Sequence, residues 1–211
     1  MTGLRRAKQS GPRRRRRPAR RSGAQIVAAI LQGAEQLLER GGVEQITTNR
    51  IAALAGVSVG SLYQYFPNKE AIVCELALRL DLRALEAAGA HVEAAAGRSL
   101  EESANITARA VLARQIGSPR LRRALQLDVP GRWLEGPREA IDERIGAMVA
   151  RVLAEREAEI REGDRERMVF IIQHALEGVA EAAVARRPAY LEDEAFGEEL
   201  AQLLFRFLRR E

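Results

Sequence analysis

Between Thr47 and Phe66 the chain carries an ordered set of capping, small and apolar residues that fits two short helices joined by a tight turn. Thr47 and Ser58 each bring a hydroxyl that can cap the helix that follows. Gly56 stands where the chain must turn sharply, and a Cβ atom would oppose the left-handed backbone expected there. This segment therefore predicts a helix-turn-helix, which limits the N-terminal part of the chain to packed helices.

The apolar residues of the segment fall on one side of each short helix. We expect Ile51 to face inward from the first helix, with the small Ala52 allowing the second helix to come close. Leu62 and Phe66 are the inward positions of the second helix. The pattern predicts a small core under the turn and leaves the opposite side of the second helix free.

From Ala24 onward the chain is dominated by Ala, Leu, Arg and Glu, and no strand pattern survives comparison with the helical one. The expected fold class is all-α. Proline and glycine mark the expected boundaries between helices. The predicted helices run over residues 24–40, 48–55, 59–65, 69–87, 100–115, 119–127, 138–161, 164–186 and 193–209, with a connection over 128–137.

Charge is distributed unevenly along the chain. The 211 residues include 34 Lys or Arg and 29 Asp or Glu, a net charge of +5, yet residues 1–22 alone hold ten basic residues and no acidic one. This stretch has no apolar periodicity with which to bury surface, so we expect a disordered arm. The chain then divides into a basic arm over 1–22, a three-helix helix-turn-helix domain over 23–69 and a larger helical domain over 70–211.

The outward residues of the second short helix are candidates for reading DNA. In a helix-turn-helix the second helix enters the major groove and presents its N-terminal residues to base edges. Gln64 can make two hydrogen bonds to adenine, and Val59 can touch a thymine methyl group. The candidate DNA-contacting residues, phosphate contacts included, are Thr47, Thr48, Arg50, Ser58, Val59, Gly60, Ser61, Tyr63, Gln64, Tyr65 and Lys69.

Three of the nine aromatic residues, Tyr63, Tyr65 and Phe66, stand within four consecutive positions at the end of this helix. Burial preference favours core packing for Phe66. The hydroxyl groups of Tyr63 and Tyr65 make contact with a phosphate or a base an alternative to packing.

Residues 23–69 carry no net charge, so part of the affinity for phosphate must come from elsewhere. The arm is the evident source, because arginines that neutralise phosphates release counterions and can also enter an adjacent minor groove. The alternative is a solvated tail that contributes nothing. The arm residues concerned are Arg13, Arg14, Arg15, Arg16, Arg17, Arg20 and Arg21.

Residues 24–72 resemble the DNA-binding domain of the TetR/AcrR family of bacterial transcriptional regulators. The resemblance covers about a quarter of the chain, and the remainder is similar to the family in length and helical pattern only. It implies a homodimer, an operator with two related half-sites, and repression relieved when a small molecule enters the C-terminal domain. The matching positions are Thr47, Ile51, Ala52, Ala55, Gly56, Val57, Ser58, Gly60, Leu62, Tyr63, Tyr65, Phe66 and Lys69.

Residues 70–211 have a net charge of −5, which disfavours contact with DNA. Wide apolar stripes on the last two long helices fit either an internal core or a four-helix contact with a second copy. We expect a homodimer through these two helices. The stripes comprise Met168, Ile171, Ile172, Ala175, Leu176 and Val179, and then Phe196, Leu200, Leu203, Leu204 and Phe207.

A ligand pocket has weaker support in the sequence. Each candidate taken singly is more often a packed or surface residue than a ligand contact, and His174, beside Gln173 in an apolar stripe, is the first to test. The candidates for binding an effector are Asn105, Arg109, Trp133, Met148, Phe170, Gln173 and His174, with His91, Thr107 and Arg114 in a wider set.

Catalysis has no support in the sequence. Two histidines 83 positions apart and one cysteine give no zinc spacing, and we find no phosphate-binding loop, nucleophile elbow or dinucleotide fingerprint. We expect no enzyme activity, cofactor or metal. Cys74 alone forms no internal disulfide, and no apolar run approaches the ~20 residues of a membrane span. A cytoplasmic location is expected.

The function expected is that of a dimeric repressor released from a palindromic double-stranded DNA operator by a small-molecule effector. Two alternatives stay open. The chain could bind nucleic acid or an anionic surface without sequence preference, through its Arg-rich arm alone, or it could be an activator with the same fold.

Overall fold

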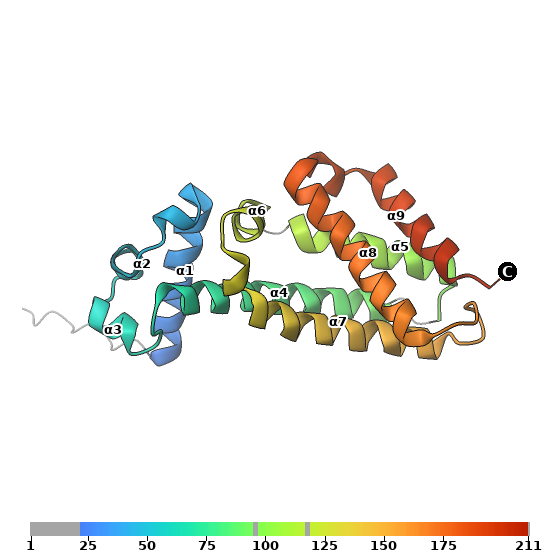
Figure 1. The fold of residues 1–211 in the computed structure, drawn as a ribbon, viewed down its shortest axis with the longest axis horizontal. Coiled ribbons are helices and arrows are strands. Elements are labelled where there is room, and N and C mark those ends of the chain that lie inside the picture. Colours follow the sequence, from blue (N-terminus) through green and yellow to red (C-terminus); the bar gives the residue numbers. More distant parts are fainter. Residues whose placement is uncertain (1–21, 95–96, 117–118, 211) are drawn as a thin grey trace, which may run out of the picture.

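The computed structural model describes residues 22–94, 97–116 and 119–210. Within these ranges the chain is built of α-helices, which confirms the all-α fold (Figure 1). The helices are α1 (Gly23–Gly41), α2 (Thr48–Ala55), α3 (Val59–Tyr63), α4 (Lys69–Ala94), α5 (Leu100–Ile116), α6 (Pro119–Leu127), α7 (Glu135–Glu155), α8 (Arg165–Arg186) and α9 (Glu194–Leu208). Short 3-10 segments lie at η1 (Val43–Gln45), η2 (Gly131–Trp133) and η3 (Pro188–Leu191).

Helices α1 to α3 and the first turns of α4 enclose one core. A capping box starts α1: the Ser22 hydroxyl accepts from the Gln25 backbone N–H, and the Gln25 side chain accepts from the Ser22 N–H. Ile30, Ile51 and Leu62 are fully buried. Burying each of these aliphatic side chains stabilises the fold by about 1.5–3 kcal/mol, so this core fixes how α2 and α3 sit on α1.

Helix α6 joins this first core although the sequence assigns it to the larger domain. Leu121, Ala124 and Leu125 are buried in the same cluster as the residues of α1, and Val129 and Leu134 extend it along the connection to α7. The helix-turn-helix and the rest of the chain therefore share buried surface.

The long helix α4 runs from the helix-turn-helix to the far end of the molecule, with α7 beside it (Figure 1). It ends at Ala94 rather than at residue 87. The prediction stopped where the apolar stripe fades after Leu85, but residues 84–94 are rich in Ala and contain no Pro, so the helix continues without an apolar face.

Helix α7 begins three residues before the predicted start and ends six residues before the predicted end. Pro137 lies in its first turn, where backbone N–H groups have no acceptor within the helix, so a proline costs nothing there. At the other end, Ile160 pairs with Arg209 in a single antiparallel bridge, and the Arg161 N–H donates to the Leu208 oxygen at 2.8 Å. Contacts with the end of α9 thus replace the last predicted turns.

A second core lies between α5, α7, α8 and α9. Ala104 and Ala108 of α5 let α9 pack closely, and Met168 and Ile172 of α8 together with Leu204 of α9 fill the interior. Both terminal helices thus contribute one face to an internal core.

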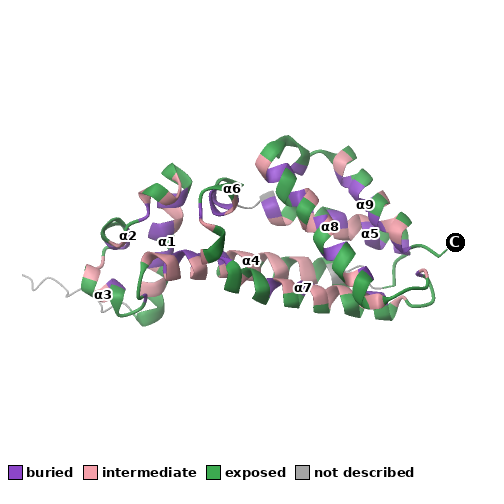
Figure 2. Cartoon of the chain, in the orientation of Figure 1, coloured by how far each residue is buried: buried purple, intermediate pink, exposed green. Residues whose placement is uncertain are grey.

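The other face of α8 is exposed, so buried and exposed residues alternate along the helix (Figure 2). Phe170 and Ile171 of α8 are 63% and 45% exposed, and Leu203 of α9 is 51% exposed. By length and composition, α8 is also long and apolar enough to cross a membrane, and it is the one such helix in the described ranges. The unbroken apolar runs of the sequence predict no such segment, because Glu177 and Glu181 interrupt the apolar stretch of α8.

Candidate nucleic-acid interface

The turn between α2 and α3 has the predicted geometry. The Thr47 hydroxyl accepts from the Arg50 backbone N–H at 3.2 Å, and the Ser58 hydroxyl accepts from the Ser61 N–H at 3.0 Å, so each caps its helix. Gly56 is left-handed, with φ 65° and ψ 38°. These three residues hold two short helices at a fixed angle, which is the arrangement of a helix-turn-helix.

Helix α3 presents a polar and aromatic outer side over an apolar inner side. Leu62 is fully buried, whereas Tyr63 and Tyr65 are 51% and 39% exposed and Gln64 is exposed. Val59 is half-buried and packs against the first core, which leaves less of it free for a base than predicted.

The helix is also two residues shorter than predicted, because the Gln64 N–H donates to the Ser61 oxygen and tightens the last turn. Gln64 is therefore the C-cap of α3 rather than a residue within it. Tyr65 follows the helix.

Several candidate side chains already make contacts within the protein. The Thr48 and Tyr63 hydroxyls lie 3.3 Å apart and link α2 to α3, and the hydroxyls of Ser58 and Ser61 lie 3.1 Å apart. The Lys69 ammonium lies 5.5 Å from the centre of the Trp133 ring, in the range of a cation–π contact. These contacts fix the candidate residues in place.

Arg50, in the first turn of α2, donates from its guanidinium to the side chain of Gln45 in η1. Arg50 is exposed. Such a group can contact a phosphate without reading a base.

The candidate arginines of the arm lie outside the described residues. The last residue of the arm, Ser22, caps α1, and a Cβ at Gly23 would be 3.4 Å from the Tyr65 hydroxyl. The chain therefore leaves α1 toward its N-terminus beside an exposed residue of the candidate interface.

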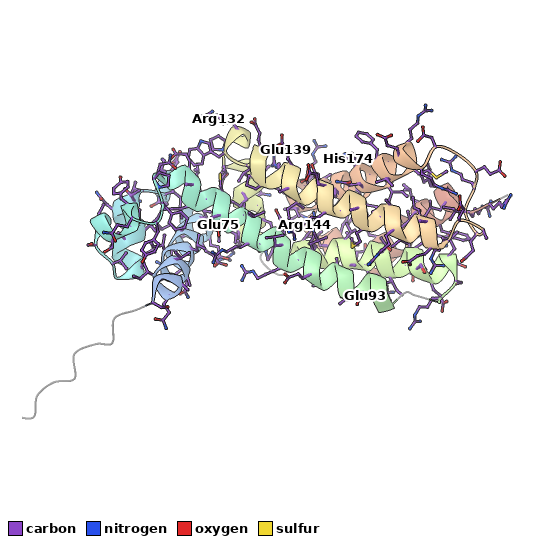
Figure 3. All side chains as sticks on the ribbon, turned by 90° about the horizontal axis from the view of Figure 1, so that it is seen from below. Glu75, Glu93, Arg132, Glu139, Arg144 and His174 are labelled. Atoms are coloured by element: carbon purple, nitrogen blue, oxygen red, sulfur yellow. The ribbon has the colours of Figure 1, made fainter. Side chains whose placement is uncertain are left out.

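The predicted effector-binding residues do not converge. His174 projects from α8 beside α7 (Figure 3) and lines a cavity of about 320 Å³ between α4, α5, α6, α7 and α8, together with Arg114. Met148 lines a different cavity of about 60 Å³, and Trp133 packs on Lys69.

The remaining candidates are engaged elsewhere. The Asn105 amide donates to the Glu101 backbone oxygen, and Arg109 forms an exposed ion pair with Glu194 at 3.1 Å. Phe170 packs edge-on against His174 on the exposed side of α8, with ring centres 4.3 Å apart.

Gln173 is buried and does not line the 320 Å³ cavity; its amide donates to the Asp142 backbone oxygen at 3.2 Å. Residues that sequence reasoning passed over line the cavity itself: Asp81, Gln115, Arg122 and Glu177. The sequence gives little indication that these residues line a cavity, because polar residues of an amphipathic helix are usually on its exposed side.

Comparisons with known proteins agree with this geometry. Residues 30–76 match the family model described as bacterial regulatory proteins, tetR family, and residues 99–208 match the model of the tetracyclin repressor-like C-terminal domain. The fold and its helix-turn-helix are those of a bacterial regulatory protein. The chain belongs to the tetR family.

Curated relatives align with about a third of the chain. The HTH-type transcriptional regulators EthR of Mycolicibacterium smegmatis and of Mycobacterium tuberculosis are each 43% identical to this chain over 70 residues. The alignment covers 33% of this chain and 32% of each relative, so it spans about a third of the curated relatives' length.

Two solved structures share the fold over nearly the whole chain. FadR of Bacillus halodurans, a fatty acid degradation regulator, has a TM-score of 0.71 at 22% identity and covers 91% of this chain and 100% of its own. NalD of Pseudomonas aeruginosa, the secondary repressor of the MexAB-OprM multidrug efflux pump, has a TM-score of 0.65 at 22% identity and covers 89% and 98%. At this identity they establish the fold alone.

The family is one of regulatory proteins rather than enzymes, as the sequence analysis expected. Within the described ranges, no group of three or more His, Cys, Asp or Glu side chains is arranged to hold a metal ion.

Proposed function

We propose that this protein is a sequence-specific, double-stranded-DNA-binding transcriptional regulator that acts as a dimer on a palindromic operator, as a repressor released by a small-molecule effector. The observation that carries the proposal is the α2–α3 unit, in which Thr47, Gly56 and Ser58 lock a helix whose exposed side bears Tyr63 and Gln64. A helix held in this way can dock in a major groove.

The exposed residues divide into two roles. Gln64 and Ser61 can read base edges, and Gly60 allows the backbone to approach. Tyr63 and Arg50, with Thr47, Thr48 and Lys69, hold the phosphates and set the register of the helix in the groove.

Because residues 23–69 have no net charge, the arm over 1–22 supplies much of the attraction to phosphate. The position of Gly23 beside Tyr65 supports this role, since the arm then starts at the edge of the proposed DNA surface.

A two-fold operator needs a two-fold protein, and the exposed apolar side of α8 and α9 supports a dimer there. Phe170, Ile171 and Leu203 are exposed, and a groove between the two helices is lined by Val179 and Phe196. Packing two copies of this helix pair would form a four-helix contact.

Ile171→Glu and Leu203→Glu are each expected to make the protein monomeric, because a carboxylate would then be buried in this contact. Analytical ultracentrifugation measures the oligomeric state, and Glu198→Gln is the control that is expected to stay dimeric.

The test of the proposed function is a fluorescence anisotropy titration of the full chain with a duplex from the region upstream of its own gene and with a scrambled duplex of equal length. We expect tighter binding to the upstream duplex by at least tenfold and a stoichiometry of two chains per site. Equal binding to both duplexes would instead support the sequence-indifferent binder. A transcription assay in vitro then separates a repressor from an activator.

A further inference from the structure

The chain is uncharged from residue 51 to residue 68, over most of α2 and the whole of α3. This stretch contains no Lys, Arg, His, Asp or Glu, although charged residues make up 30% of the chain. Protein surfaces that bind DNA are usually strongly positive. The side chains that α3 can present to bases are therefore all neutral, which limits the bases that they can recognise.

The two charged residues that flank this stretch are directed toward other elements. The Arg50 guanidinium donates to the Gln45 side chain in η1. The Lys69 ammonium, at the start of α4, lies 5.5 Å from the centre of the Trp133 ring. Both positions suit contacts with phosphates, and recognition of bases is left to α3.

Guanine and cytosine are recognised in the major groove by groups that α3 lacks. Guanine presents two acceptors, O6 and N7, which are matched by the paired donors of Arg or Lys. Cytosine presents the N4 amine, which is matched by the carboxylate of Asp or Glu. Because none of these side chains occurs in residues 51–68, α3 has no matched contact for a G·C pair.

The amide of Gln64 matches adenine. Adenine presents the N7 acceptor beside the N6 donor, and a glutamine amide offers one oxygen acceptor and one nitrogen donor at the same spacing. Gln64 is exposed at the C-cap of α3, and no hydrogen bond within the described part of the chain engages its side chain. Both ends of the amide are therefore free to pair with a base.

The Ser61 hydroxyl lies one turn before Gln64, on the same side of the helix. The Ser61 backbone N–H donates to the Ser58 Oγ at 3.0 Å, and the Ser58 hydroxyl donates back to the Ser61 Oγ at 3.1 Å. The Ser61 oxygen is thus already an acceptor, and its own proton is left for another partner. Thymine O4 is an acceptor in the major groove, so Ser61 can donate to a thymine.

The space over Gly60 is open. A Cβ built there would lie 3.9 Å from the Ser58 Oγ and meet no other side chain of the described residues within 4 Å. No packing contact therefore requires a glycine, although glycine lowers the stability of a helix relative to alanine. A glycine at such a position allows a ligand to approach the backbone, and the thymine methyl group projects into the major groove.

We propose that α3 recognises A·T pairs in the major groove. Gln64 pairs with adenine, while Ser61 and the bare backbone of Gly60 contact thymine O4 and the thymine methyl group. The inference rests on the proposed function and names the class of operator: half-sites whose determining pairs are A·T. Contacts of the arm in a minor groove do not enter this class, because N7, O4 and the methyl group all face the major groove.

The first experiment is a selection with the full chain from a duplex library. The library carries about 30 random base pairs, which is room for two half-sites one or two helical turns apart. We expect the enriched duplexes to share two related half-sites whose most constant pairs are A·T. Half-sites whose most constant pairs are G·C would overturn the inference and leave the proposed function standing. A library without enrichment would refute the proposed function, and the inference with it.

Base analogues in the selected duplex then show which groups are recognised. Uracil in place of thymine removes the methyl group, and 7-deazaadenine in place of adenine removes N7, both in the major groove. Each analogue is expected to weaken binding by about fivefold, whereas 7-deazaguanine at every guanine should change the Kd by less than about twofold. Anisotropy titrations measure the three effects. A loss with 7-deazaguanine as large as that with 7-deazaadenine would overturn the inference.

A change of side chain at residue 64 tests the contact with adenine. Gln64→Arg supplies the paired donors that guanine requires, so a repeated selection is expected to replace one A·T pair of each half-site with G·C. The control is Gln32→Arg, which adds the same charge at an exposed position of α1 outside α2 and α3. It should enrich the same duplexes as the unchanged protein. Selection of those same duplexes by Gln64→Arg would remove Gln64 from base recognition and overturn the inference.

A methyl group at residue 60 tests the close approach of thymine. Gly60→Ala is expected to raise the Tm, because alanine favours the helix, and to weaken binding to the selected duplex by about tenfold, because the added Cβ takes the place of the thymine methyl group. The control Gly89→Ala, in open space within α4, should also raise the Tm but leave the Kd unchanged. An unchanged Kd in Gly60→Ala would contradict the contact with thymine.

Discussion

Single residues decide whether the α2–α3 turn forms, and Gly56 is the clearest of them. Its left-handed backbone is one that residues with a Cβ adopt at a cost of roughly 1–2 kcal/mol. A Cβ built there would meet no atom within 4 Å, so the cost is one of backbone strain rather than of collision. The sequence alone pointed to this position, because a glycine between two capped helices is typical of a tight left-handed turn.

Gly56→Ala is expected to lower the free energy of unfolding by about 1–2 kcal/mol, measured by urea denaturation. The matched control is Gly89→Ala, also in open space but inside α4, which is expected to raise it by about 0.5–1 kcal/mol. Changes of the same sign in both variants would contradict the assignment.

Variants of Gln64 and Arg50 test the proposed division between base reading and phosphate binding. Gln64→Ala is expected to reduce the preference for the operator over a scrambled duplex by about 1–3 kcal/mol, the value of a good bidentate contact. Arg50→Ala is expected to weaken both duplexes alike and to reduce the salt slope by about 1. Anisotropy titrations over a salt series measure both effects, and a loss of preference in Arg50→Ala would reverse the assignment.

At the scale of elements, the sequence predicted the helices with signals at both ends best. Helix α2 has a capping threonine and a terminal glycine, and its predicted bounds are those observed. Helix α4 is longer than predicted, because the residues after 87 carry neither an apolar stripe nor a stop signal. The end of α7 depends on a bridge to Arg209, a contact between distant residues that no local pattern encodes.

The same limit applies to the sites. The helix-turn-helix is local, so its caps and exposed residues could be read from consecutive positions. The cavity of about 320 Å³ that His174 and Arg114 line draws residues from five helices. Gln115 and Arg122 become recognisable as cavity residues only when the packing of α5 and α6 shows that they are buried.

The Asp81–Arg122 pair joins α4 to α6 and tests how that packing is held. Asp81→Leu is expected to lower the free energy of unfolding by about 3 kcal/mol, because it leaves the buried Arg122 without its partner. The double variant Asp81→Leu with Arg122→Met should recover most of the loss. Thermal or urea unfolding of the two single variants and the double variant gives the coupling, and additive losses would show that the pair is not coupled.

At the scale of the whole molecule, charge and function are divided along the chain. The arm holds ten basic residues, the helix-turn-helix segment is neutral, and residues 70–211 carry −5. In the proposed function, attraction to DNA and recognition of its sequence belong to different parts of the chain, and the two are expected to respond differently to salt.

Deleting residues 2–21 is therefore expected to weaken binding to all duplexes and to flatten the dependence of log Kd on log salt by about 0.9 for each phosphate the arm neutralises. The preference for the operator over a scrambled duplex should be largely kept. The control replaces the arm's arginines with glutamines at the same length. An unchanged salt slope in both variants would assign the arm to solvent.

One helix, α4, begins at the helix-turn-helix and lines the 320 Å³ cavity with Ala77 and Asp81. Its 26 residues at about 1.5 Å each make a rod about 39 Å long. Tilting such a rod by about 5° at one end displaces the other by about 3 Å, roughly the length of a hydrogen bond. In the proposed dimer, the two α3 helices enter successive grooves together, so a tilt of α4 of this size is expected to change their spacing until it no longer matches the helical repeat of DNA.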